Sequence, residues 1–339
     1  MNEKLYQSSY AEVLPVELEA EDIDRSRQFL ESLSITGLNS WIAERTVTNN
    51  FNGQPYRMVI DRPTDGNHDK ALIVLSEYGT GILPRLVAKS RVMRDTLDPD
   101  ATLIIQPSTT RTESNMNYSK SERSDIYKGD LRPVISRLAI VMESLGSPED
   151  LTIFGPSQGA MIGMAYAGSD YSPSASVVAV EAPNIVDRSG LQLAIDLTLS
   201  GSDLSKVVSA NFNDHSAPFA VLAEKDASSV KELSRFLYSS LHPDNLATMG
   251  AMRYSSLSAD IDSVISKGGN IVHVWGDKDN VSPSRDNELI AQEFGIQLAY
   301  KGICLPGMTH SITDFYALDG ALTRMAHNRK NLKLFRHFL

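Results

Sequence analysis

Short apolar runs alternate with helical and polar stretches through most of the chain. Several of these runs are almost entirely apolar or β-branched, which is typical of strands buried on both faces. We expect strands at residues 71–75, 101–105, 151–154, 175–180, 271–275 and 296–300. Apolar positions at helical spacing occur at residues 83–93, 131–145 and 312–337. Strands that alternate with helices in this way predict an α/β fold with a mostly parallel central sheet flanked by helices.

Two stretches depart from this alternation. Residues 46–48 and 56–60 are short strand-like runs with Asn52 and Gly53 between them, and this pattern predicts a β-hairpin. The polar stretch 107–127 predicts a loop near the strand ends.

The pattern divides the chain into four parts. Residues 1–45 are acidic and amphipathic, and we expect them to form an N-terminal helical extension. Residues 46–183 and 269–339 hold the strands of the core. Residues 184–268 are mostly helical or polar, with no clear buried strand. An insertion of this kind predicts a helical cap over the strand ends, where such sheets place their active sites.

One turn in the core has the residues of a catalytic motif. A predicted strand ends in Gly155-Pro156-Ser157-Gln158-Gly159, and a helix rich in small residues follows, as in a G-x-S-x-G nucleophile elbow. The turn would present the Ser157 hydroxyl above the sheet, and the glycines would avoid collisions where helix and strands converge. The Gln158 backbone N–H would form half of an oxyanion hole. The alternative is a glycine-rich turn in which Ser157 only caps the helix.

Two later loops carry a carboxylate and a histidine, each immediately after a predicted strand. They supply Asp279 and His310, so the order along the chain is Ser, Asp, His. His310 would accept the proton of Ser157, and ionised Asp279 would orient the imidazole. Asp277 competes with Asp279 for this role, and His310 could be an ordinary loop histidine. His273 lies inside a strand, where we expect it to pack.

These stretches together resemble the motifs of the α/β-hydrolase superfamily, from about Thr46 to the C-terminus. The matches are G-x-S-x-G at Ser157, the acid loop at Gly276 and Asp279 with Val281 and Pro283 one position offset, and P-G-x-x-H at Pro306, Gly307 and His310. The resemblance implies an eight-stranded, mostly parallel sheet and acyl transfer through a covalent serine ester.

The resemblance also suggests a second oxyanion donor. Tyr78-Gly79-Thr80-Gly81 is similar to the family's H-G-x-G loop, with tyrosine where histidine is usual. This implies that the backbone N–H of Thr80 acts together with that of Gln158.

Composition narrows the classes of function. A formal net charge of −10 and a pI near 5.2 argue against nonspecific binding to nucleic acid or to an anionic membrane. We see no membrane-spanning stretch and no secretory signal, so we expect a cytoplasmic protein. The single cysteine, Cys304, allows no intrachain disulfide, and its apolar surroundings favour a structural thiol. We expect no metal site, because the pair Asp214-His215 lacks further ligands and more often belongs to a solvated loop. We also expect no cofactor.

The leading hypothesis is a serine esterase that acts on a small-molecule carboxylic ester under a helical cap. An acyltransferase, a thioesterase or an amidase or peptidase would use the same triad, and a catalytically idle hydrolase fold would serve as an interaction module. Serine at the elbow disfavours a dehalogenase or an epoxide hydrolase, because both need a carboxylate there. The sequence does not determine the substrate or the oligomeric state.

Overall fold

One sheet runs through the described part of the protein. The computed structural model describes residues 28, 35–51, 54–64, 69–77, 84–107, 118–183, 242–254, 256–279, 281–305, 320 and 322–328. The strands are β1 (Thr46–Phe51), β2 (Gln54–Asp61), β3 (Lys70–Leu75), β4 (Thr102–Gln106), β5 (Asp150–Pro156), β6 (Ala175–Val180), β7 (Asn270–Gly276) and β8 (Tyr300–Leu305). They form an 8-stranded sheet in the order β1-β2-β4-β3-β5-β6-β7-β8.

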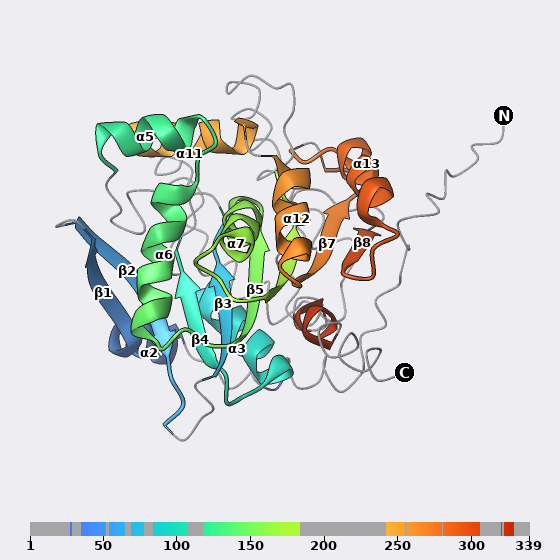
Figure 1. The fold of residues 1–339 in the computed structure, drawn as a ribbon. Coiled ribbons are helices and arrows are strands. Elements are labelled where there is room, and N and C mark those ends of the chain that lie inside the picture. The colour runs from blue at the N-terminus through green and yellow to red at the C-terminus, as the bar shows by residue number, and fades with distance from the viewer. Residues whose placement is uncertain are drawn as a thin grey trace.

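The pairing of the strands is mostly parallel. β2 pairs antiparallel with β1 and with β4, and every other neighbouring pair is parallel. The expected α/β fold is therefore confirmed (Figure 1). The expected hairpin is present as well, since β1 and β2 pair from Thr46 and Val59 to Phe51 and Gln54.

Helices cover both faces of the sheet (Figure 1). They are α2 (Ile35–Arg45), α3 (Pro84–Leu97), α5 (Lys120–Tyr127), α6 (Arg132–Ser144), α7 (Gln158–Gly168), α11 (Pro243–Tyr254), α12 (Leu257–Ser266) and α13 (Ser284–Phe294). Side chains of α6, α7, α12 and α13 join one buried cluster, whereas α2, α3 and helical residues 322–328 join another. Successive residues of a strand enter different clusters, with Ile153 in the first and Phe154 in the second. This two-sided burial explains the continuous apolar runs.

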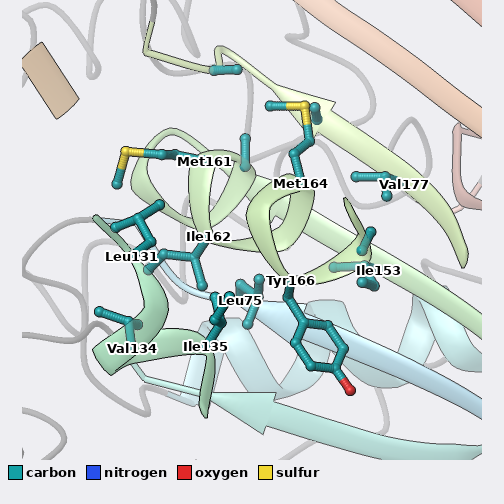
Figure 2. Close-up of a cluster of buried hydrophobic side chains, with 14 of the residues drawn as sticks. Leu75, Leu131, Val134, Ile135, Ile153, Met161, Ile162, Met164, Tyr166 and Val177 are labelled. Atoms are coloured by element: carbon teal, nitrogen blue, oxygen red, sulfur yellow. The ribbon is translucent and has the colours of Figure 1, made fainter. Parts of the chain in front are cut away.

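Helix α7, which follows the candidate elbow, is buried on nearly all sides. Figure 2 shows Ile162 near Ile135 of α6, and Met164 near Val177 of β6. Met161 is also buried, so both methionines belong to the core. A helix that is apolar around its whole circumference is stable only when it is enclosed in this way.

The last strand begins later than the sequence pattern predicts. We expected a strand at 296–300, but β8 runs from Tyr300 to Leu305. Ile296 and Leu298 are 83% and 67% exposed, in the turns between α13 and β8. Pairing with β7 sets this register, because Tyr300 lies opposite Ile271 and Leu305 opposite Gly276. The alternation before Tyr300 therefore arises in a surface turn.

The expectation of a loop at 107–127 is wrong for its last third. Helix α5 occupies Lys120–Tyr127 and begins with a capping box in which Ser119 and Glu122 each accept a hydrogen bond from the other's backbone N–H. The S-x-x-E spacing that signals such a helix start is present in the sequence. Residues 108–117 lie outside the described part.

Helices α5 and α11 pack against each other although they are far apart in sequence. In Figure 1 they lie at the top of the molecule, beyond the ends to which the parallel strands point. Nη1 of Arg123 donates to Oδ1 of Asp244 at 3.0 Å, and Asp244 is 1% exposed. A Cβ on Gly250 would lie 2.8 Å from the Tyr127 carbonyl oxygen, so this glycine permits the close approach.

Candidate active site

Ser157 occupies a strained turn between β5 and α7. Its φ is 47° and its ψ is −119°, a conformation that is uncommon for a residue other than glycine. The backbone N–H of Ser157 donates to the Val180 carbonyl at 2.8 Å, and its carbonyl accepts from the Ala160 N–H at 3.0 Å. Within the described first turn of α7, the Ser157 side chain makes no capping hydrogen bond. The turn therefore has the geometry of an elbow and not of a serine N-cap.

The glycines on either side of Ser157 make this turn possible. A Cβ on Gly155 would lie 2.4 Å from the carbonyl carbon of Gly159, and a Cβ on Gly159 would lie 2.8 Å from the Leu75 carbonyl oxygen. Such contacts with backbone cannot be relieved by moving a side chain. A side chain at either position would thus collide with the backbone, as the sequence predicts, so both positions require glycine.

Asp279 is buried in the loop after β7, at 4% exposure. Its backbone N–H donates to the Gly276 carbonyl at 3.3 Å. Its Oδ1 accepts the backbone N–H groups of Val281 at 2.7 Å and Ser282 at 2.9 Å. These two bonds fix the rotation of the carboxylate. Asp277 is exposed, which makes Asp279 the better oriented of the two carboxylates.

The sheet topology brings Ser157 and Asp279 to the same edge. Ser157 follows β5 and Asp279 follows β7, with β6 between these two parallel strands. Two strand spacings correspond to roughly 10 Å. This separation leaves room for one imidazole ring between the hydroxyl and the carboxylate.

A further carboxylate, which sequence reasoning missed, lies between them along this edge. Glu181 follows β6, is 1% exposed and has a φ of 53°. Its backbone N–H donates to the Val274 carbonyl at 2.7 Å. The available signal was a carboxylate placed directly after a continuous apolar strand.

The other residues expected in the site are Gln158, His310 and Thr80. Gln158 begins α7 and is fully buried, next to Ser157 at the helix N-terminus. His310 and Thr80 lie outside the described residues, as do Asp214 and His215. Strands β3 and β8, which precede the segments containing Thr80 and His310, are parallel to β5 and β7 and end at the same edge.

Two other titratable side chains lie within strands β7 and β8. His273 is fully buried, its Nδ1 lies 2.9 Å from the Tyr300 hydroxyl, and burial lowers its pKa to about 4. Cys304 is partly buried, and burial raises the pKa of its thiol to about 11. A thiol that holds its proton is a weak nucleophile, in agreement with the structural role expected for Cys304.

The described residues show neither a metal-binding cluster nor a membrane-spanning helix. They contain no group of three or more His, Cys, Asp and Glu side chains that could hold a metal ion. In the same part of the chain, no helix combines the length and the apolar character needed to cross a bilayer.

Solved structures share this architecture. A lipase candidate from Acinetobacter baumannii AYE superposes with a TM-score of 0.57 at 11% identity, over 92% of this chain and 97% of its own. The enzyme MGS-M2, an α/β hydrolase from a Medee basin deep-sea metagenome library, gives 0.50 at 15% identity, over 83% and 97%. The chain has the α/β-hydrolase fold.

A third α/β-hydrolase-like structure extends the comparison. The meta-cleavage product hydrolase of Pseudomonas fluorescens IP01, a variant complexed with acetates, gives a TM-score of 0.55 at 17% identity, over 86% of this chain and 99% of its own. No protein-family model and no curated protein sequence matches the chain. At these identities the likeness establishes the fold alone.

Proposed function

We propose that this α/β-hydrolase-fold protein is a serine hydrolase that cleaves a carboxylic ester through Ser157, His310 and Asp279. The observation that carries the proposal is the positive φ of Ser157 in the turn between β5 and α7. Within the described first turn of α7, the Ser157 side chain makes no capping hydrogen bond. Strain at a non-glycine residue persists where the surroundings enforce it, and such residues cluster at active sites. The buried, oriented carboxylate of Asp279 two strands away supports the same conclusion.

The proposed mechanism assigns one task to each group. His310 accepts the Ser157 proton as the hydroxyl oxygen attacks the ester carbonyl, and Asp279 stabilises the imidazolium. The backbone N–H groups of Gln158 and Thr80 hold the oxyanion, and each such donor is typically worth about 3 kcal/mol. The N-terminal end of α7 adds a favourable dipole for this charge. His310 then protonates the leaving alcohol and activates the water that hydrolyses the acyl-enzyme.

We further propose that residues 184–254 form the cap of this site. This is narrower than the expected 184–268, because α12 packs against α7 and β7 as part of the helical layer on the sheet. Helix α11 is held on α5 beyond the strand ends, in the region where a cap would cover Ser157. A cap in this position would limit the size of the acyl or alcohol group.

The direct test replaces Ser157 with alanine. We expect Ser157→Ala to lower kcat/KM for short p-nitrophenyl esters at least about 1,000-fold and to abolish labelling by a fluorophosphonate. Thioester and amide analogues, assayed alongside with and without an added alcohol acceptor, would distinguish an esterase from a thioesterase, an amidase or an acyltransferase.

A matched control is Ser176→Ala. Ser176 is a fully buried serine in the adjacent strand β6, near the strand's amino end and therefore away from the proposed site. This variant should keep wild-type turnover and labelling. If Ser157→Ala kept both the turnover of p-nitrophenyl esters and the labelling by a fluorophosphonate, the proposed function would be refuted.

A further inference from the structure

We propose that Asn287 and Ser282 are positioning residues that hold the catalytic carboxylate of Asp279 in place. The inference rests on the proposed function, since it concerns the acid of the same site. It begins from the loop formed by residues 277–279 and 281–283 after β7, which we call the acid loop. The Asp279 carboxylate is oriented by two backbone N–H groups of this loop, so its orientation depends on whatever holds the loop.

Asn287 holds the acid loop from helix α13. Its side chain is fully buried, and its Nδ2 lies 3.0 Å from the Ser282 carbonyl oxygen, 3.0 Å from Ser282 Oγ and 3.2 Å from the Pro283 carbonyl oxygen. The two hydrogens of one amide group are thus shared among three acceptors at the end of the loop. Buried backbone carbonyls need such partners, because losing them costs more than an ordinary hydrogen bond contributes.

Ser282 joins the acid loop to the neighbouring strand. It is fully buried, its backbone N–H donates to Asp279 Oδ1 at 2.9 Å, and its Oγ donates to the Ala182 carbonyl at 2.6 Å. Ala182 comes directly after Glu181, at the end of β6. A single residue therefore connects the carboxylate of Asp279, the end of β6 and the amide of Asn287.

Asn287 belongs to the first turn of α13, and side chains of this helix pack in the same buried cluster as residues of β7 and β8. The acid loop is thus held by α13 through Asn287 and by the end of β6 through Ser282. A fixed carboxylate matters because a misplacement of about 1 Å can cost about 100-fold in rate.

The test compares four variants of the full chain. Asn287→Ala removes the amide, Ser282→Ala removes the hydroxyl, and Ser282→Thr restores a hydroxyl. The matched control is Asn270→Ala, since Asn270 is equally buried but starts β7 at the opposite end of the strand from the acid loop. Two quantities are measured: amide hydrogen exchange of the peptide that covers Val281 and Ser282, and the pH dependence of kcat/KM for a p-nitrophenyl ester.

We expect both readouts to change in Asn287→Ala and Ser282→Ala. Exchange at the Val281 and Ser282 amides should become about 10-fold faster, because the loop opens more easily. kcat/KM should fall about 10- to 100-fold, mainly through kcat. The acidic limb of the pH profile should move to lower pH, because a poorly oriented carboxylate raises the pKa of the catalytic base less. Ser282→Thr should recover most of both changes, and Asn270→Ala should show neither.

The outcomes separate this inference from the proposed function. Unchanged exchange in both Asn287→Ala and Ser282→Ala would overturn it, whatever the activity. Faster exchange with an unshifted pH profile would also overturn it, because the contacts would then be structural only. If the wild-type protein shows no Ser157-dependent turnover, the proposed function fails, while exchange still decides whether Asn287 and Ser282 hold the loop.

Discussion

At the scale of single residues, the site is built from groups whose local geometry is costly. Ser157 and Glu181 both have positive φ, and such residues typically cost about 1–3 kcal/mol each. Hydrogen bonds between neighbouring strands hold them, since the Ser157 N–H is bound by β6 and the Glu181 N–H by β7. Strained residues that follow β5 and β6 and a buried carboxylate that follows β7 thus share one sheet edge.

The choice between the two aspartates can be tested at this scale. Asp279→Asn should lower kcat/KM for p-nitrophenyl esters about 1,000- to 10,000-fold, because an amide cannot stabilise the imidazolium of the base. Asp277→Asn should keep kcat/KM within a few-fold of wild type, because Asp277 is exposed and the two backbone N–H groups of the loop donate to Asp279. We expect both variants to melt within a few degrees of wild type, so that differences in kcat/KM report on catalysis and not on unfolding.

Glu181→Gln belongs in the same experiment. Glu181 is a buried carboxylate on the same edge, one strand closer to Ser157. A large loss of kcat/KM in Glu181→Gln together with a small loss in Asp279→Asn would identify Glu181, after β6, as the acid of the triad in place of Asp279. The contacts of Asn287 and Ser282 would then be structural only, and their proposed positioning role would be wrong.

At the scale of elements, the pair of helices α5 and α11 is the least predictable part of the described fold. Its capping box lies within α5, but its packing joins residues more than a hundred positions apart. Arg123 bridges them by donating to the Tyr118 carbonyl at 2.7 Å and to Asp244 at 3.0 Å. The partner carboxylate is almost fully buried, so it depends on this guanidinium.

Removing Arg123 should therefore destabilise the protein. Arg123→Ala leaves the buried Asp244 charge without this cation, and we expect a loss of about 1–3 kcal/mol in the free energy of unfolding, less than for a fully buried pair because Arg123 is 34% exposed. Urea unfolding followed by circular dichroism measures it. The matched control is Arg132→Ala. Arg132 pairs with Asp130 but is 80% exposed, so its removal should not measurably change the free energy of unfolding. Equal losses in both variants would contradict the argument.

At the scale of the whole molecule, a partly buried carboxyl group makes stability depend on pH. Burial raises the pKa of Asp260, in the first turn of α12, to about 7 from an ordinary value of 3.8. Between these pH values the unfolded chain releases this proton while the folded protein keeps it. The contribution of Asp260 to stability therefore falls as pH rises from about 4 to 7 and is lowest above pH 7.

Asp260→Asn should remove this dependence. The variant should gain melting temperature over wild type at pH 8 and much less at pH 5, because only the ionised carboxylate is penalised by burial. Thermal unfolding at the two pH values measures the difference. Asp262→Asn, on the exposed side of the same helix, is the control and should give the same difference from wild type at both pH values. A gain of equal size at pH 5 and pH 8 in Asp260→Asn would argue against the raised pKa.

The sequence by itself determined the sheet layer and the elbow. Continuous apolar runs predicted β3 to β7, because strands buried on both faces have no polar side. The turn around Ser157 was also predictable, since the collision that demands Gly155 is with Gly159, four residues along the chain. Local periodicity and local sterics are properties that a single sequence displays.

Only the tertiary structure decided the register of β8, the packing of α5 on α11 and the surroundings of Asp279. Alternating residues before Tyr300 looked like a strand, but pairing with β7 selected Tyr300–Leu305. The sequence left Asp277 and Asp279 open, and burial with two backbone N–H bonds distinguishes them. The contacts of Ser282 with Ala182 and of Arg123 with Asp244 join distant segments, so no spacing along the chain reveals them.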